Sequence, residues 1–294
     1  MMERSDMPRD APFATLRAGC KINLNLFITG VRPDGWHELD SLFAPLPEPH
    51  DILRLYPADG PGLTVACDVP GIDPARNTLT RAYELFAAAG GFAPGINVRL
   101  DKGIPHGAGL GGASSDAAAL LLWLNAAAPQ PLSAEALRAV AVRVGADVPF
   151  FLLNAPCRAL GVGDVLTPCQ TGLAGWHLVL VCPPARVSTP WAYKAFDAAQ
   201  EALTACGARN IRQPAFGAGW PGVPLVNDFE PVVFAAHPAV RACKEHLLAC
   251  GADGAVMSGS GAAAMGLFRR KTTADAAQRA CISRYGAAWA HALG

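Results

Sequence analysis

The chain has 294 residues, of which 51% are hydrophobic and 16% are charged, so it can bury a substantial core and is not expected to be disordered. This length suits two modest domains better than one. Lys and Arg together number 24, and so do Asp and Glu. Proteins that bind duplex nucleic acid normally carry a basic excess, so nucleic acid is not an expected partner.

The cysteines and the termini indicate the compartment. The nine cysteines are dispersed and form no C-x-x-C pair, which argues against a disulfide framework and a zinc site and is typical of a reducing cytosol. The first twelve residues are charged and lack an apolar core, so we expect no signal peptide. The longest apolar run contains Asn125 and is shorter than the roughly 20 residues of a membrane helix. We therefore expect a cytoplasmic protein without membrane contact.

The first predicted element is a strand over 20–29, in which apolar and polar residues alternate. Its polar face carries Lys21, Asn23 and Asn25. The stretch RPDG follows and predicts a turn, because Pro fixes φ and Gly accepts a positive φ. A second extended segment over 36–43 returns from this turn, so the sequence predicts a hairpin.

Strands and helices then interleave along the rest of the chain. In the first half we predict strands at 51–56, 63–69 and 95–101 and helices at 78–89, 114–127 and 133–144. In the second half we predict strand-like segments at 150–160, 176–182, 254–258 and 262–268, and helices from 189 and at 228–236, 239–250 and 273–284. This order, with hairpins, favours the α+β class. A polar stretch at 161–175 predicts a boundary between domains 1–165 and 166–294, and a Gly/Pro-rich excursion is expected at 206–224.

Four glycines within six residues precede a helix in PHGAGLGGASSD, residues 105–116. Such a loop turns successive N–H groups into one concavity, and a helix N-terminus behind it favours anions. Three of the glycines satisfy a dinucleotide pattern, but a second helix follows where that motif needs a strand, and the chain has no Walker G-K-[S/T]. The paired serines favour phosphate binding, although Ser114 or Ser115 could instead cap the helix.

Two charged residues are candidates for chemistry. Pro149 is expected to push Val148 out of helical geometry, which leaves Asp147 on an irregular segment where it can face a cleft. From the residues alone, Asp147 is as well explained as a helix cap or a turn residue. Lys21 is similarly explained as a solvated residue on an exposed strand face.

Four segments resemble the signatures of the GHMP kinases, in the order of that family. They are KINLNLFITGVRPDGWHEL (21–39), PHGAGLGGASSDAA, GADVPFFL (145–152) and MSGSGAAAMGLF (257–268). The first is the most specific and is similar to members that phosphorylate the 2-hydroxyl of a cytidine diphosphate derivative of methylerythritol, in the non-mevalonate isoprenoid pathway. Another small-molecule kinase of the family is the alternative. The resemblance implies a two-domain GHMP kinase fold, with a ribosomal-protein-S5-like N-terminal domain, a ferredoxin-like C-terminal domain and the substrates in the cleft between them.

The resemblance also implies roles for individual residues. Asp147 is expected to be the general base, and Lys21 to keep its carboxylate ionised and to stabilise the developing alkoxide. ATP is the expected donor, and the residues expected to bind it are Pro105, His106, Gly107, Ala108, Gly109, Leu110, Gly111, Gly112, Ala113, Ser114 and Ser115. Magnesium is expected as a bridge between the phosphates, with no protein ligand assigned. The substrate is expected to contact Asn23, Trp36, His37 and Tyr193, and Gly259, Ser260 and Gly261 form a supporting glycine loop.

Simpler explanations remain open for several of these residues. Trp36 could fill a hydrophobic core, His37 could be a satisfied turn histidine, and 259–261 could be an ordinary hairpin turn. At the level of the whole protein, a nicotinamide-dependent oxidoreductase and a nucleotide-binding regulator without chemistry are the rivals from other classes. The sequence is compatible with a monomer or a homodimer.

Overall fold

The computed structural model describes residues 11–67, 69, 77–90, 92–205 and 224–294. The predicted excursion at 206–224 therefore lies outside the described residues except for its last position. The chain divides into two compact units that interleave in sequence. The first unit consists of Met1–Cys20, Pro47–Ile104 and Gly111–Asn154, and the second of Lys21–Leu46, Pro105–Leu110 and Ala155–Gly294. A single domain boundary near residue 165 stays a prediction.

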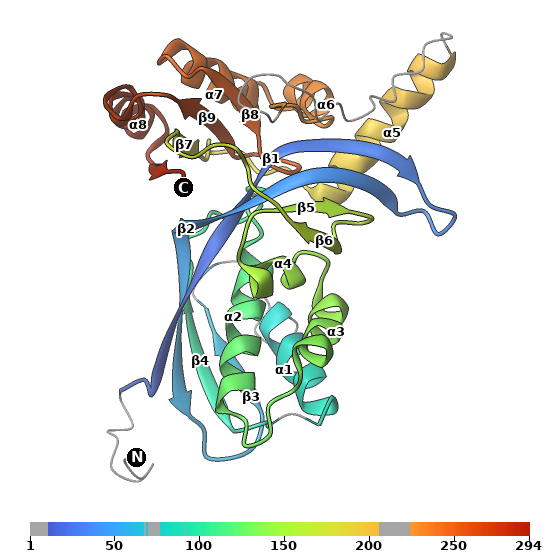
Figure 1. Cartoon of the computed structure of the whole chain (residues 1–294), viewed down its shortest axis with the longest axis vertical. Coiled ribbons are helices and arrows are strands. Elements are labelled where there is room, and N and C mark those ends of the chain that lie inside the picture. The colour runs from blue at the N-terminus through green and yellow to red at the C-terminus, as the bar shows by residue number, and fades with distance from the viewer. Residues whose placement is uncertain (1–10, 68, 70–76, 91, 206–223) are drawn as a thin grey trace. The chain divides into compact units, whose positions relative to one another are not determined.

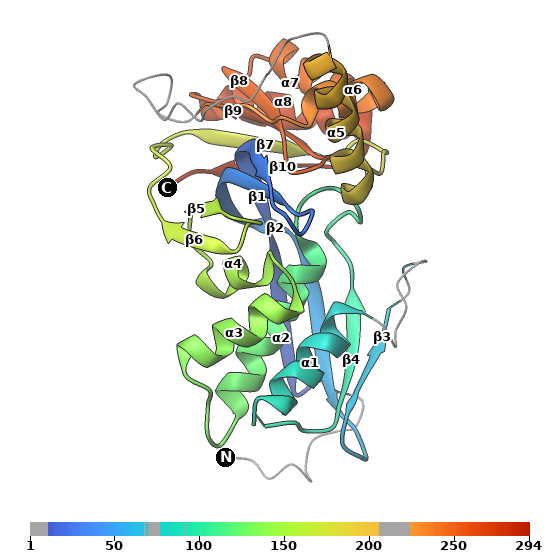
Figure 2. The same ribbon diagram turned by 90° about the vertical axis from the view of Figure 1, so that its right-hand side faces the viewer.

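The first unit packs helices on one face of a small sheet (Figures 1 and 2). Its strands are the N-terminal part of β1 (Ala14–Val31), the C-terminal part of β2 (His37–Pro57), β3 (Leu63–Ala66) and β4 (Ile96–Asp101). The central strand β4 pairs antiparallel with residues 52–57 of β2 and parallel with β3. The helices are α1 (Thr78–Ala88), α2 (Gly112–Ala127), α3 (Ala134–Val144) and α4 (Val148–Leu153). Buried side chains recur at helical spacing in α1, at Leu79, Ala82, Tyr83 and Phe86, so this helix turns one apolar stripe to the core.

Local capping chemistry explains where two of these helices begin. The Asn77 side chain accepts a hydrogen bond from the N–H of Thr80, and that of Ser133 accepts from the N–H of Ala136. Both helix starts agree with the sequence prediction.

The predicted strand-like segment at 150–160 is partly wrong. Residues 148–153 form the helix α4, and only Cys157–Leu160 is a strand, β5. Val148 is the first residue of α4, so Pro149 does not exclude it from helical geometry. Proline is tolerated in the first helical turn because its missing N–H has no intrahelical partner there. A short apolar run bears no periodicity that separates a buried helix from a buried strand.

A buried ion cluster anchors the segment that leads into the glycine loop. Asp51 is buried and accepts hydrogen bonds from the N–H groups of Gly103 and Ile104, each at 2.8 Å. Lys102 contacts the carboxylate of Asp51 and also that of Asp116, the latter at 2.9 Å. Burial raises the pKa of Asp116 to about 7, although Lys102 opposes the shift. The cluster holds β2, the end of β4 and helix α2 in one arrangement.

The second unit contains a four-stranded antiparallel sheet with the order β10-β7-β9-β8. These strands are β7 (His177–Val181), β8 (Gly254–Met257), β9 (Ala264–Phe268) and β10 (Ala288–Ala292). Helices α7 (Pro238–Ala249) and α8 (Lys271–Tyr285) pack on it through one apolar core that includes Val179, Leu247, Phe268 and Cys281. Strand order and helix positions are those of a ferredoxin-like β-α-β-β-α-β arrangement, as expected. Strand β10 was not predicted.

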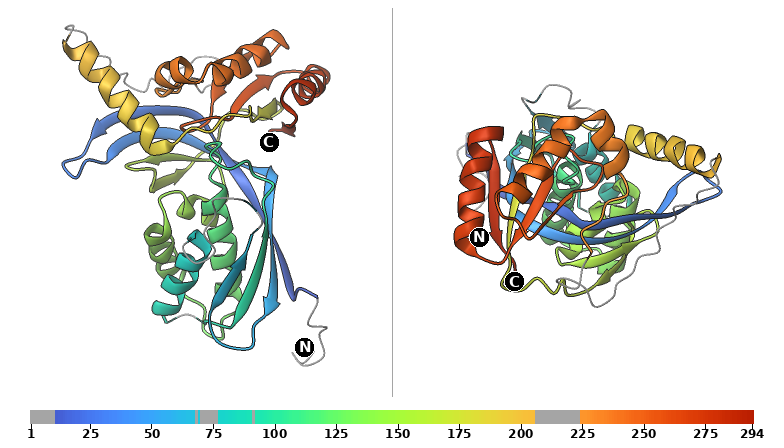
Figure 3. Two further views of the ribbon diagram at one scale, coloured as in Figure 1. Left: turned by 180° about the vertical axis from the view of Figure 1, so that it is seen from behind. Right: turned by 90° about the horizontal axis from the view of Figure 1, so that it is seen from above.

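The rest of the second unit surrounds a long hairpin. It contains the hairpin part of β1 (Ala14–Val31) and β2, the strands β5 and β6 (Val165–Pro168), and helices α5 (Thr189–Ala205) and α6 (Glu230–Ala236). Residues 41–43 of β2 pair with β5, which pairs with β6. Helix α5 lies beside the hairpin in the views from behind and from above (Figure 3). None of the helices described here is long and apolar enough to cross a membrane.

Candidate functional site

The glycine loop has the backbone that an anion site requires. Gly107, Gly109 and Gly111 have φ values of 71°, 75° and 72°, in the left-handed region that favours glycine. Gly111 is the N-cap of α2, so Ser114 and Ser115 are the third and fourth residues of that helix and do not cap it. The capping alternative for the serines is therefore wrong. The N–H groups of the first helical turn lack intrahelical acceptors, and together with the loop they favour a bound anion.

A second glycine turn packs directly against the first part of this loop. The N–H of Ala263 donates to the carbonyl of Ala108 at 3.1 Å, and the Ser258 hydroxyl donates to the carbonyl of Gly109 at 3.4 Å. A Cβ atom on Gly109 would lie 2.5 Å from the Ser258 carbonyl oxygen and 3.1 Å from that of Gly261. Only a residue without a Cβ atom fits where Gly109 approaches residues 258–261. These residues therefore pack against the glycine loop and do not merely form a hairpin turn.

We predict that Gly109→Ala destabilises the fold beyond the cost of its backbone conformation. Gly286→Ala is the matched control, because Gly286 has φ 86° and a Cβ added there would meet no atom within 4 Å. The steric contact at Gly109 should add about 1–3 kcal/mol to the loss of unfolding free energy in urea. Equal losses in the two variants would show that the two glycine turns separate at no cost.

Lys21 and Asn23 lie on the inner part of the hairpin and are both buried. The Lys21 ammonium donates to Asn23 Oδ1 at 3.0 Å and lies 4.1 Å above the centre of the Phe43 ring. Asn23 donates from its side chain to the Ser41 hydroxyl at 2.9 Å and from its main chain to the Ser258 hydroxyl at 3.1 Å. The interpretation of Lys21 as a solvated surface residue is wrong. A hydrogen-bonded chain instead links Lys21 through Asn23 to the interlocked glycine turns.

Asp147 belongs to the first unit, at the N-cap position of α4, and is partly exposed. Its side chain makes no capping hydrogen bond to α4, so capping does not account for an acid at this position. The turn that carries it passes close to helix α2, because a Cβ on Gly145 would lie 3.9 Å from Ser114 Oγ. The same unit therefore brings the Asp147 segment beside the start of the phosphate-loop helix.

The hairpin turn carries Trp36, whose exposed fraction is 64%. The turn is held by hydrogen bonds from the Arg32 N–H to the Trp36 carbonyl and from the Trp36 N–H to the Asp34 side chain. A core-filling role for Trp36 is therefore wrong. Within the described part of the chain, no other ring contacts this indole, which leaves it accessible to a planar ligand.

His37 follows Trp36 and is held by helix α5. Its Nε2 lies 2.6 Å from Asp197 Oδ1, and its ring lies over Tyr193 with centroids 4.5 Å apart and planes 30° apart. Phe229 and Tyr193 form a T-shaped contact, with ring centroids 4.8 Å apart and planes 87° apart. Two of the expected substrate residues, His37 and Tyr193, are thus brought together by the fold, although they are far apart in sequence.

Two residues of this region were missed by sequence reasoning. Asp197 lies four positions after Tyr193, and this spacing places both on one helix face, a signal that could have suggested it. Arg186 is exposed, and its Cβ and Cγ lie within 4 Å of the position that a Cβ on Gly107 would take. A cation beside the phosphate loop suits a phosphate ligand, but no pattern in the sequence relates these two positions.

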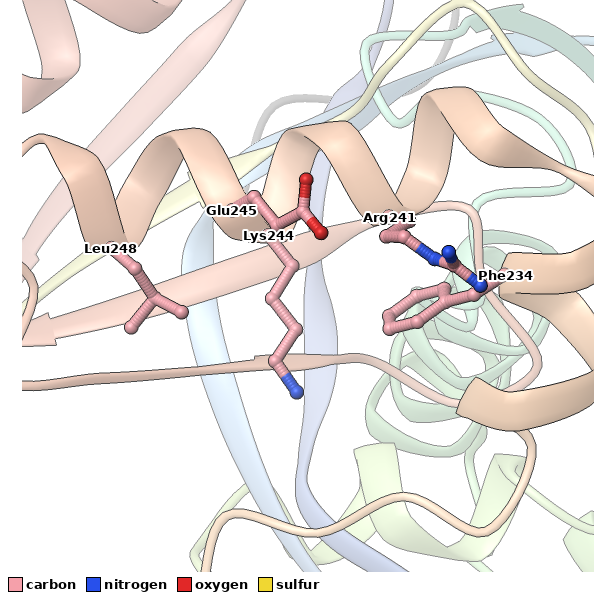
Figure 4. A pocket seen from close by; sticks show the side chains of 5 residues that line it. All are labelled: Phe234, Arg241, Lys244, Glu245 and Leu248. Atoms are coloured by element: carbon pink, nitrogen blue, oxygen red, sulfur yellow. The ribbon is translucent and has the colours of Figure 1, made fainter.

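A surface cavity of about 380 Å³ lies elsewhere in the second unit, between α6 and α7 (Figure 4). It is lined by Phe234, Arg241, Lys244, Glu245 and Leu248. Lys244 is paired with Glu230 at 2.6 Å, so its charge is already balanced. No residue implicated by the sequence lines this cavity.

The comparisons with known proteins agree with this geometry. Residues 77–155 match the GHMP kinases N terminal domain, and residues 214–288 match the GHMP kinases C terminal domain. The chain belongs to the GHMP kinase family, which confirms the two-domain α+β prediction and excludes the oxidoreductase alternative. It is a small-molecule kinase, and this class implies ATP as the phosphoryl donor.

Within the family, the chain is similar to 4-diphosphocytidyl-2-C-methyl-D-erythritol kinases. It is 53% identical to one from Nitratidesulfovibrio vulgaris over 90% of this chain and 93% of the relative. It is 51% identical to one from Solidesulfovibrio magneticus over 88% of this chain and 89% of the relative. A crystal structure of 4-(cytidine 5'-diphospho)-2C-methyl-D-erythritol kinase superposes with a TM-score of 0.72 at 34% identity, covering 94% of this chain and 98% of that one. The fold is shared by a homoserine kinase from Cytophaga hutchinsonii, which is 16% identical. Its structure superposes with a TM-score of 0.63 and covers 99% of this chain and 96% of that one.

Proposed function

We propose that this chain transfers the γ-phosphoryl group of ATP to the 2-hydroxyl of 4-diphosphocytidyl-2-C-methyl-D-erythritol. The observation that carries the proposal is 53% identity, over nine tenths of the chain, to a kinase named for that substrate. The interlocked glycine turns support phosphoryl transfer. A substrate that carries a nucleobase is supported by the exposed ring of Trp36 and by His37, whose imidazole is fixed by Asp197.

A coupled assay of ADP release tests this function directly. With ATP and magnesium, we expect turnover on 4-diphosphocytidyl-2-C-methyl-D-erythritol and none above background on mevalonate or homoserine. Phosphorylation should be confirmed at the 2-hydroxyl by phosphorus NMR of the product. Faster turnover on mevalonate or homoserine would instead support the alternative, another small-molecule kinase of the family.

In the proposed mechanism, Asp147 accepts the proton of the 2-hydroxyl as the oxygen attacks the γ-phosphorus and the bond to ADP breaks. Lys21 stabilises the negative charge that develops on the attacking oxygen. The burial of Lys21 and its hydrogen bond to Asn23 support this role, because a charge held away from water acts more strongly on a neighbouring group.

Main-chain N–H groups between Pro105 and Ser115 would bind the ATP phosphates, with residues 259–261 supporting the loop. The described residues hold no cluster of three or more His, Cys, Asp or Glu side chains suited to a metal. Mg²⁺ bound mainly by phosphate oxygens and water would fit this donor set. When bound, Mg²⁺ neutralises phosphate charge. The cytoplasmic location and the monomeric or homodimeric state stay predictions.

Trp36→Ala should raise KM for the cytidylyl substrate about tenfold, because loss of one base–aromatic stack costs ~1–3 kcal/mol. The kcat should change little, since the indole would bind the ground state and the transition state equally. Trp36→Phe is the control and should retain most of the affinity, because it keeps a ring at the exposed turn. If KM were unchanged in steady-state kinetics of Trp36→Ala, the base would bind elsewhere.

A further inference from the structure

His37 is held in the second unit by a carboxylate that neither the sequence motifs nor the family resemblance assigns. The Nε2 atom lies 2.6 Å from Asp197 Oδ1. The His37 side chain is only 9% exposed, whereas that of Asp197 is 43% exposed. A carboxylate oxygen can only accept a hydrogen bond, so this contact requires a proton on Nε2, which both the neutral Nε2–H tautomer and the doubly protonated imidazole supply. In a neutral imidazole, Nδ1 is then an acceptor.

The packing fixes the ring as well as its proton. Tyr193 covers the imidazole at a centroid distance of 4.5 Å, and Phe229 meets Tyr193 edge-on at 4.8 Å. Tyr193 and Asp197 lie one turn apart on α5, so a single helix supplies both the stacking surface and the acceptor. A rotation of the imidazole that exchanged its two nitrogens would break the contact with Asp197.

We infer that Asp197 is a positioning residue that sets the base specificity of the proposed reaction, by holding His37 as the Nε2–H tautomer. This inference rests on the proposed function. His37 then offers an acceptor, Nδ1, to the base. Cytosine carries an amino donor at its 4-position, and uracil carries a carbonyl acceptor there. A fixed acceptor therefore favours a cytidylyl substrate and opposes its uridylyl analogue, since two acceptors facing each other are both left unpaired.

The tautomer is tested without any substrate. In protein labelled with nitrogen-15 histidine, at pH ~8 where an ordinary imidazole is neutral, we expect His37 to show the Nε2–H pattern. Its resonances are assigned by their loss in His37→Gln. Asp197→Ala should convert the signal to a mixture of tautomers. Glu201→Ala is the matched control, because Glu201 is an exposed acid one turn further along α5, and it should leave the signal unchanged.

Steady-state kinetics then test specificity. Asp197→Ala should raise KM for the cytidylyl substrate about tenfold, the effect of one net hydrogen bond, with kcat nearly unchanged and less discrimination against the uridylyl analogue. Asp197→Asn, whose side-chain oxygen can still accept from Nε2–H, should recover most of the affinity. An Nδ1–H tautomer or a doubly protonated His37 in the unmodified protein, or unchanged discrimination in Asp197→Ala, would overturn the inference. Absence of turnover by the unmodified protein would count against the proposed function, while the NMR result would still decide the role of Asp197.

Discussion

Asp147→Asn is expected to lower kcat by about 10²–10⁴, the range for loss of a positioned proton-transfer group. The amide is nearly the size of the carboxylate but cannot take the hydroxyl proton. Because the Asp147 side chain makes no capping hydrogen bond to α4, the substitution should cost less stability than the loss of a helix cap. The measurements are kcat in the ADP-release assay, ATP affinity by titration calorimetry, and unfolding free energy in urea. ATP affinity should be retained.

Ser133→Ala provides the matched control for a residue that does cap its helix. Ser133 accepts from the Ala136 N–H at the start of α3, in the same unit as Asp147. Its loss should cost about 1 kcal/mol of stability and leave kcat unchanged. The two variants therefore separate chemistry from capping. Near-normal turnover by Asp147→Asn would remove the general-base assignment, and a stability loss as large as that of Ser133→Ala would point to a structural role.

Lys21→Ala is the second change with a large expected effect, a fall in kcat of about 10²–10⁴ with ATP binding retained. Its ammonium is buried, bonded to Asn23 and stacked on Phe43, so truncation also leaves a cavity and an unpaired amide oxygen. Lys21→Met keeps the length and apolar stem of the side chain and removes the charge together with the hydrogen bond to Asn23. We expect Lys21→Met to match Lys21→Ala in kcat and to be more stable in urea.

The control for charge alone is Lys271→Met, on the exposed start of α8, where Lys271 pairs with Asp275. This variant should keep normal kcat, because exposed ion pairs contribute little. The double variant of Lys21→Met with Asp147→Asn tests whether the two residues act as a unit. Their effects on kcat should be far from additive, as is typical of groups that serve one proton transfer. Full additivity would show that Lys21 and Asp147 act independently.

The site was partly predictable because much of its chemistry is local in sequence. The glycine pattern at 107–112 by itself predicted a loop with positive φ before a helix, and three of its glycines have φ near 70°. The prediction of a GHMP kinase came from the order of four motifs, and the family match confirms the family. Asp197 was not found, because its partner His37 lies on a hairpin far away in sequence.

The sequence by itself determined the features that depend on neighbouring residues: the extended conformation of the segment at 20–29, the caps at Asn77 and Ser133, and the glycine turns. Only the tertiary structure decided the features that depend on what packs against a segment. The apolar run of α4 forms a helix, and the alanine-rich β10 forms a strand because it pairs with the edge of β7. Lys21 can be buried because its ammonium group donates a hydrogen bond to Asn23 and lies over the ring of Phe43. Backbone propensity and capping act within a few residues, whereas burial and pairing depend on partners that the chain brings together only when it folds.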